Sequence, residues 1–194
     1  MRLVLSTRNP HKVRELGVLL APHDVLPLPD DVELPPETGT TFAENALAKA
    51  RVAARATGLP AVADDSGIEA AALSGAPGVR SARYAGENAT DEENLQKLLA
   101  EVPQDGDRRV SYVCALAYVN RDEERLFEGR CDGTLAIEPR GTGGFGYDPA
   151  FIPSDRDDGR TMAELTVEEK DAISHRGRAA RAFLGWLDRE TRAA

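Results

Sequence analysis

The chain has 194 residues, of which 41% are hydrophobic and 29% charged, and its formal net charge at pH 7 is −9. This length and composition predict a single globular domain over residues 1–194, and the acidic balance argues against a nucleic-acid polymer as a partner, because phosphate backbones need a basic surface. Apolar runs are short and Cys114 and Cys131 are the only cysteines, so we expect no membrane span, signal peptide or disulfide framework, and a cytoplasmic location.

Four helices are predicted from their start signals. A Thr followed three residues later by Glu predicts a capping box, which occurs at Thr41–Glu44, Thr90–Glu93 and Thr166–Glu169. The first box opens a helix within residues 38–58, the second a helix over residues 91–101, and the third the C-terminal helical region. Asn9 as N-cap and Pro10 at the first helical position predict a further helix over residues 10–21.

Strands are predicted at residues 2–6, 24–28, 61–63, 110–119 and 124–138. Residues 110–119 are apolar on both faces, which is typical of a central strand. Within residues 124–138 we expect one or two strands, broken near Gly129 and Gly133. Strands alternate with helices early and a β-meander follows, which predicts an α/β fold with a mixed sheet rather than a purely parallel one.

The segment PAVADDSGIEA places two carboxylates directly after a short apolar run. Ala61–Ala63 predict the end of a buried strand, and Asp64 and Asp65 there carry a desolvation cost unless they are paired. Ser66 and Gly67 follow, and these residue types are typical of a turn. The alternative is a metal or general-base site at a strand end, where α/β folds place their chemistry. The segment by itself leaves both interpretations open.

The segment STRNPHK, residues 6–12, joins the first predicted strand to the first helix. Amide groups at a helix N-terminus favour an anion, and Lys12 adds a positive charge. The segment lacks the G-x-x-x-x-G-K-[ST] pattern, so the chain is not a P-loop NTPase. The alternative interpretation is a capped helix with a solvated lysine. The Pro-rich stretch Pro27–Pro36 that follows predicts a long loop.

The segment GTGGFGYDPAF, residues 141–151, is rich in glycine and aromatic residues. Glycines let the backbone approach a ligand closely, and Phe145 or Tyr147 could stack on a planar base. The alternative is a tight turn that packs Phe145 into the core. Asp148 and Pro149 predict turn chemistry under either interpretation.

Near the C-terminus, Lys170, His175 and Arg176 would point in different directions on one straight helix, because residues advance by about 100° each. They can serve one ligand only if the helix breaks near Ser174, which is a suitable N-cap. The alternative is a capped turn at the surface.

Together, five segments resemble the inosine triphosphate pyrophosphatase family: STRNPHK, ETGTTFAENALAKA, ADDSGIEAAALSGAPGVRSARYAG, GTGGFGYDPAF and ISHRGRAARAF. The resemblance runs from about Leu3 to Phe183. It implies a two-lobed α/β fold around a long bent mixed β-sheet with flanking helices and an active-site cleft between the lobes. It also implies a homodimer and a Mg²⁺-dependent attack of water on the α-phosphate. The substrates would be ITP, dITP and XTP, and the products the nucleoside monophosphate and pyrophosphate.

The resemblance also implies roles for individual residues. Asp65 would be the proton acceptor, and Glu37 and Asp65 would bind the metal, with Asp64 in support. The implied substrate-binding residues are Thr7, Arg8, Asn9, Pro10, His11, Lys12, Ser66, Phe145, Gly146, Tyr147, Asp148, Lys170, His175 and Arg176. Residues 7–12 would hold the triphosphate, residues 145–148 the base and sugar, and the last two the 6-oxo group of the base. Lys49 would face the phosphates.

Three other functions fit parts of the pattern. A Maf-like pyrophosphatase would cleave other modified nucleotides. A HAD-type phosphatase would use an aspartyl nucleophile such as Asp64 or Asp65, but the D-x-D pattern expected near the N-terminus is absent. A nucleotide-binding sensor would bind without turnover, which the retained Glu37, Asp65 and Lys12 argue against. The products distinguish these readings.

Overall fold

The computed structural model describes the backbone of residues 1–193. Its strands are β1 (Arg2–Leu5), β2 (Asp24–Pro27), β3 (Ala61–Ala70), β4 (Arg109–Val119), β5 (Glu124–Leu135) and β6 (Phe151–Pro153). Its α-helices are α1 (Pro10–Leu19), α2 (Phe42–Thr57), α3 (Asp91–Glu101), α4 (Val167–Ile173) and α5 (His175–Ala193). Short 3₁₀ helices lie at Ala71–Leu73, Gly78–Arg83, Asp148–Ala150 and Met162–Glu164. Among the described helices, none combines the length and the apolar character that crossing a bilayer requires.

The six strands form one sheet in the order β2-β1-β3-β4-β5-β6. Strand β1 pairs in parallel with both β2 and β3, whereas β5 and β6 are antiparallel, so the sheet is mixed as predicted. The chain divides into two compact units, and β3, β4 and β5 each contribute residues to both. The α/β class and the mixed sheet expected from the sequence are therefore confirmed.

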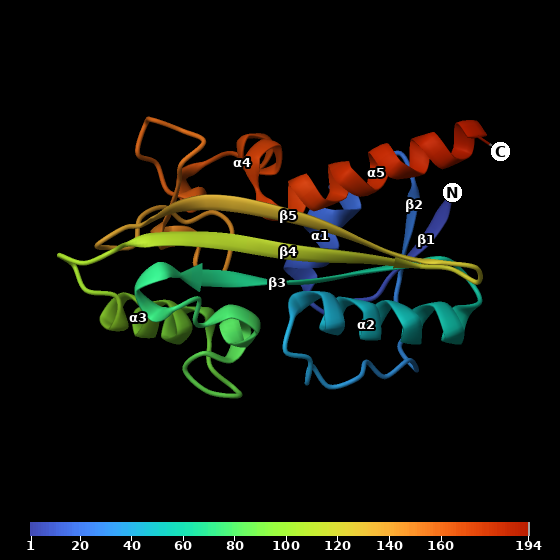
Figure 1. Ribbon diagram of the computed structural model, residues 1–194, viewed down its shortest axis with the longest axis horizontal. Coiled ribbons are helices and arrows are strands. Elements are labelled where there is room, and N and C mark those ends of the chain that lie inside the picture. Colours follow the sequence, from blue (N-terminus) through green and yellow to red (C-terminus); the bar gives the residue numbers. More distant parts are fainter. Residues whose placement is uncertain (194) are drawn as a thin grey trace. The chain divides into compact units, whose positions relative to one another are not determined.

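Unit 1 comprises Met1–Asp65, Cys114–Gly129 and Arg176–Ala194. Helices α1 and α5 cover one side of its strands and α2 covers the other (Figure 1). On the α1–α5 side, Leu16 and Phe183 pack against residues of β1, β3 and β4. On the α2 side, Ala53 packs against Val4 and Ala61. Strand β1 and the part of β3 in unit 1 are thus buried on both faces, which is typical of parallel strands.

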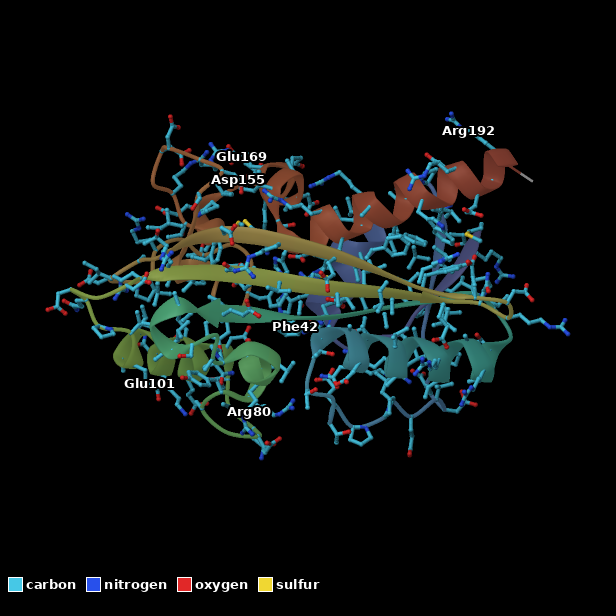
Figure 2. All side chains as sticks on the ribbon, viewed as in Figure 1. Phe42, Arg80, Glu101, Asp155, Glu169 and Arg192 are labelled. Carbon is cyan, nitrogen blue, oxygen red and sulfur yellow. The ribbon has the colours of Figure 1, made fainter. Side chains whose placement is uncertain are left out.

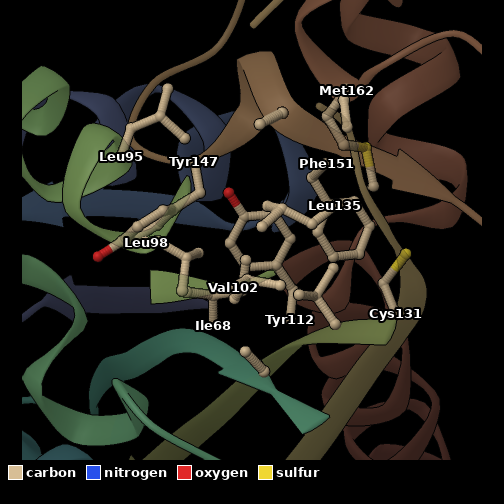
Figure 3. Close-up of a cluster of buried hydrophobic side chains, with 14 residues drawn as sticks. Ile68, Leu95, Leu98, Val102, Tyr112, Cys131, Leu135, Tyr147, Phe151 and Met162 are labelled. Atoms are coloured by element: carbon tan, nitrogen blue, oxygen red, sulfur yellow. The ribbon is translucent and has the colours of Figure 1, made fainter. Parts of the chain in front are cut away.

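Unit 2 comprises Ser66–Val113 and Arg130–His175. Its core is one cluster of buried side chains around Tyr112, which stacks on Phe151 with ring centroids 4.5 Å apart (Figure 3). Leu98 from α3 and Ile68 from β3 belong to the same cluster. Charged side chains such as Glu101 point outward from this unit (Figure 2).

Two expectations about the strands are wrong. Strand β3 does not end at Ala63 but continues to Ala70, so Asp64 and Asp65 lie inside a strand rather than in a turn. Strand β5 is continuous from Glu124 to Leu135 and does not break at its glycines. Gly133 instead allows β6 to approach, because a Cβ there would lie 2.4 Å from the carbonyl oxygen of Ile152.

The core position of Cys114 leads to a prediction about its reactivity. Its side chain lies fully buried in β4, and burial raises the pKa of its thiol to about 12. Because the thiolate is the reactive form, native protein at pH 8 is expected to leave Cys114 unmodified by a thiol reagent, whereas unfolded protein reacts. Mass spectrometry of the labelled peptides checks this, and fast labelling of Cys114 in native protein would contradict the buried position.

Candidate active site

Two adjacent carboxylates are buried in the middle of β3. Asp64 is 0% exposed and Asp65 6% exposed. Successive side chains of a strand point to opposite faces of the sheet, so the two neighbours meet different partners. This alternation explains why the chain can place two aspartates side by side in a buried strand.

Asp64 is paired with two cations. Its Oδ2 lies 3.0 Å from Nζ of Lys12 on α1 and 3.2 Å from Nε of Arg176 on α5. The guanidinium of Arg176 also contacts Glu15 through Nη1. Burial alone would raise the pKa of Asp64, but the positive charges of Lys12, Arg176 and Lys49 outweigh it and hold this pKa well below its usual range. Asp64 is therefore an ionised counter-ion.

Asp65 faces α2. Its Oδ2 accepts a hydrogen bond from Nδ2 of Asn45 (2.9 Å), and its Oδ1 lies 3.4 Å from Nζ of Lys49. The same ammonium lies 2.6 Å from Oε1 of Glu37, in the loop before α2. Burial and the negative charge of Glu37 raise the pKa of Asp65, although Lys49 and Asn45 oppose the shift.

The predicted N-cap at the start of α1 is confirmed. Oδ1 of Asn9 accepts hydrogen bonds from the backbone N–H groups of His11 and Lys12, and Pro10 occupies the first turn. The backbone N–H of Asn9 in turn donates to Oγ1 of Thr7 (3.2 Å). The amides of His11 and Lys12 are therefore bonded to Asn9, and the charge of this segment that reaches Asp64 is that of Lys12.

Arg8 contacts the Pro-rich loop. Its guanidinium donates hydrogen bonds to the carbonyl oxygens of Leu28, Pro29 and Val32, at 2.5 to 3.0 Å. Three backbone acceptors in one loop indicate that Arg8 anchors this loop. These contacts give no support to its predicted role at the triphosphate.

In unit 2, Asp148 joins several of the predicted site residues. Its Oδ2 lies 2.7 Å from Nζ of Lys170 and accepts a hydrogen bond from the backbone N–H of Phe145 (2.9 Å). Its Oδ1 accepts a hydrogen bond from the hydroxyl of Tyr112 (3.1 Å). Nζ of Lys170 also lies 5.1 Å from the ring centroid of Phe145. Asp148 therefore holds the glycine-rich loop against α4.

The helix break near Ser174 is confirmed, since α4 ends at Ile173 and α5 begins at His175. The imidazole of His175 stacks on the ring of Tyr112, with centroids 4.5 Å apart and planes 13° apart. Tyr112 thus contacts both His175 and Asp148.

The other predicted residues of unit 2 have local roles. The ring of Tyr147 belongs to the core cluster of unit 2, and its hydroxyl donates to the carbonyl oxygen of Ser81 (2.7 Å). The backbone N–H of Gly146 donates to Asp91 (2.8 Å). Ser66 is half-buried in β3. None of these contacts tests a role in substrate binding.

Three residues of these clusters are absent from the sequence predictions. Asn45 and Glu15 complete the groups around Asp65 and Asp64, and Tyr112 completes the group around Asp148. A signal existed for Asn45, because it lies four residues before Lys49 and both are polar residues on the buried face of α2. Tyr112 is one of several large residues in an apolar strand and carried no such signal.

The described residues contain no group of three or more His, Cys, Asp or Glu side chains suited to hold a metal ion. What unit 1 offers is a cluster of four carboxylates, Glu15, Glu37, Asp64 and Asp65, and the three cations Lys12, Lys49 and Arg176. The fold and this cluster define an α/β protein with a largely buried site of paired charges in unit 1.

The chain belongs to the Ham1 family, whose family model matches residues 3–186. It is 51% identical to a dITP/XTP pyrophosphatase of Shigella flexneri over 196 residues, which cover 96% of this chain and 98% of that protein. It is also 51% identical to a dITP/XTP pyrophosphatase of Streptomyces coelicolor, over 94% of this chain and 95% of that protein. The resemblance found in the sequence is confirmed.

The chain is also similar to solved structures of proteins with these names. A HAM1 protein from Coxiella burnetii is 44% identical, with a TM-score of 0.86 over 97% of this chain and 99% of that one. A nucleoside-triphosphatase, named also dITP/XTP pyrophosphatase, from Mycobacterium abscessus is 46% identical, with a TM-score of 0.75 over 95% of this chain and 99% of that one.

Proposed function

We propose that this chain hydrolyses ITP, dITP and XTP to the nucleoside monophosphate and pyrophosphate, and so keeps these non-canonical purines out of nucleic acids. One observation carries the proposal: the Glu37–Lys49–Asp65 group occurs in a chain about half identical, over nearly the full length, to proteins named dITP/XTP pyrophosphatase. The chain would then be a hydrolase acting on acid anhydrides, with residues 1–194 acting as one domain.

Glu37 and Asp65 are the proposed ligands of Mg²⁺. Both carboxylates contact one cation, the Lys49 ammonium, so oxygens of both are within reach of a shared positive charge. This donor set fits Mg²⁺, which proteins commonly hold with one or two carboxylates plus substrate phosphates. When bound, the metal ion supplies positive charge that offsets the phosphates and polarises the phosphoryl group.

Asp65 is the proposed proton acceptor. The oxygen of a water molecule forms a bond to the α-phosphorus, the bond between that phosphorus and the pyrophosphate oxygen breaks, and a proton of the water passes to Asp65. A raised pKa makes this carboxylate a stronger base than an ordinary Asp. Lys12 and Lys170 are assigned to the charge that develops on the leaving pyrophosphate.

The remaining assignments follow the family resemblance. Residues 7–12 are proposed for the triphosphate, Ser66 for a further substrate contact, and residues 145–148 for the base and sugar. His175 and Arg176 are proposed to donate to the 6-oxo group of hypoxanthine or xanthine. Adenine has a 6-amino group there, and the resulting unpaired donors would disfavour ATP.

Assembly and location are also proposals. We propose a homodimer in the cytoplasm that acts on a small nucleotide. Light scattering coupled to gel filtration would measure the mass of the assembly, and cell fractionation would locate the protein.

The test is a set of initial rates with ITP, dITP, XTP, GTP and ATP at equal concentration, with and without Mg²⁺, in which pyrophosphate and orthophosphate are measured separately. We expect Mg²⁺-dependent pyrophosphate release that favours the first three substrates. Orthophosphate as the product would indicate a phosphatase, and turnover of GTP or ATP as fast as of the first three substrates would favour a Maf-like enzyme. Binding of all five without turnover would indicate a sensor.

A further inference from the structure

Asn45 uses both ends of its side-chain amide. It lies in the first turn of α2, just after the Thr41–Glu44 capping box, and is 3% exposed. Its Nδ2 donates to Oδ2 of Asp65 (2.9 Å), and its Oδ1 accepts from the backbone N–H of Gly39 (2.8 Å). The side chain therefore connects a carboxylate of β3 to the loop that precedes α2.

These bonds close a ring. Oδ1 of Asp65 lies 3.4 Å from Nζ of Lys49, and the same Nζ lies 2.6 Å from Oε1 of Glu37. Glu37 lies two residues before Gly39, whose backbone N–H donates a hydrogen bond to Asn45. Asn45 and Lys49 thus bind one oxygen each of the Asp65 carboxylate, and each also reaches the same short loop. A carboxylate held at both oxygens has a defined plane.

The close approach at Gly39 supports this arrangement. A Cβ at position 39 would lie 2.6 Å from Oδ1 of Asn45 and 2.8 Å from Cβ of Glu44. Any larger residue would therefore push the Asn45 amide or the loop away. The position needs glycine because the Asn45 amide occupies the space next to it.

From this ring we propose that Asn45 is a positioning residue, which sets the orientation of the Asp65 carboxylate and the place of the Glu37 loop. The inference rests on the proposed function, in which these two carboxylates act on the substrate. A reacting group must be held within a fraction of an ångström, and the partners that orient it contribute to the rate without touching substrate.

The chain contains a matched control. Asn94 follows the Thr90–Glu93 capping box as Asn45 follows its own, and is 2% exposed. Its Oδ1 accepts from the backbone N–H of Ala85 (2.8 Å) and its Nδ2 donates to the carbonyl oxygen of Ala82 (3.2 Å). Both bonds are to backbone, so its amide orients no carboxylate.

The experiment compares Asn45→Ala with Asn94→Ala. For Asn45→Ala we expect kcat for pyrophosphate release from ITP to fall by about 10–100-fold, as for other residues that orient an active group, with KM within about threefold. Asn94→Ala is expected to keep the wild-type kcat, even if its unfolding temperature falls as much as that of Asn45→Ala. Gly39→Ala should lower kcat in the same way, whereas Gly17→Ala, where a Cβ meets nothing within 4 Å, should not.

A second measurement uses the protein without substrate or metal. Hydrogen exchange at the Gly39 amide is expected to accelerate in Asn45→Ala and to stay unchanged in Asn94→Ala. An unchanged kcat in Asn45→Ala, or equal losses in the two variants, overturns the inference. Absence of pyrophosphate release by the wild-type protein would instead contradict the proposed function, and exchange at Gly39 would then decide alone whether Asn45 holds the loop.

Discussion

Asp65→Asn is expected to lower the rate of pyrophosphate release from ITP by about 10²–10⁴-fold, the usual contribution of a general base, while the unfolding temperature stays the same or rises. Asparagine keeps the shape of the side chain, and its amide oxygen can accept one of the two bonds that Asp65 receives, from Asn45 or from Lys49. It cannot take a proton from water. Rates with saturating ITP and thermal unfolding of the same samples measure both parts of the prediction.

The stability part follows from the pKa of Asp65. Burial and Glu37 raise this pKa above that of the unfolded chain, so the folded state binds the proton more tightly. Ionised Asp65 therefore costs stability, and this cost appears as pH rises from the unfolded pKa, about 3.9, through the folded one. A neutral side chain removes the cost at neutral pH, and its advantage should vanish at pH 3, where Asp65 is protonated in both states.

Asp64→Asn is the control, and the opposite result is expected for stability. The cations around Asp64 hold its pKa below the unfolded value, so the ionised carboxylate stabilises the fold above the unfolded pKa, and this contribution is lost as pH falls. The variant leaves Lys12 and Arg176 facing a neutral amide and should unfold at a lower temperature at pH 7. If both variants lost activity and stability alike, the assignment of separate roles to the two aspartates would be wrong.

The helices could be predicted because their signals are local. The side chain of Thr41 accepts a hydrogen bond from the backbone N–H of Glu44, and the side chain of Glu44 accepts one from the backbone N–H of Thr41. Thr90 and Glu93 form the same pair of bonds. Such a signal needs no knowledge of the rest of the chain, and α3 has the predicted bounds, Asp91–Glu101.

The course of β3 could not be predicted in this way. Asp is a residue type that favours turns. Asp64 is stable in a buried strand because it contacts Lys12 of α1 and Arg176 of α5, and both helices are distant from it in the sequence. Strand β6 is three residues long, and only its pairing with β5 defines it. In both cases contacts remote in sequence decide the structure.

The candidate site also has some residues that the sequence indicates by themselves and others that depend on contacts remote in sequence. Residue types that carry charge, such as Asp65 and Lys170, stand out in the sequence, and the family resemblance implies their roles. Asn45 and Tyr112 act through hydrogen bonds and ring contacts to residues outside their own elements. The spacing of Asn45 from Lys49 indicates only that the two share a face of α2, and the part of Tyr112 in the site is visible only once its partners are placed.

Arg176→Ala is expected to lower the free energy of unfolding by about 3–5 kcal/mol, and hence the unfolding temperature by about 6–20 °C for a chain of this size. The Arg176 side chain is 2% exposed and contacts Asp64, whose side chain is 0% exposed, and Glu15. Removing the guanidinium takes away one of the cations that face Asp64 and the Arg176 contact of Glu15. The cost is that of one buried carboxylate, Asp64, and one half-buried carboxylate, Glu15, which have each lost a partner.

Arg51 provides the matched comparison, because it makes a two-bond contact with Glu124 at the surface of the same unit, with side chains 44% and 42% exposed. Arg51→Ala is expected to cost at most about 1 kcal/mol, since water and salt screen exposed pairs. The double variant Arg176→Met with Asp64→Asn should recover part of the loss, because the carboxylate that lost its partner is then neutral.

The same measurement separates two roles for Arg176. If its main contact were the base of the substrate, Arg176→Ala would raise KM for ITP and reduce the preference over ATP, and the unfolding temperature would change little. If it is chiefly the counter-ion of Asp64 and Glu15, stability falls first, and the ITP/ATP ratio of the remaining folded protein stays near the wild-type value. Both changes together would mean that one buried guanidinium links the stability of unit 1 to the choice of base.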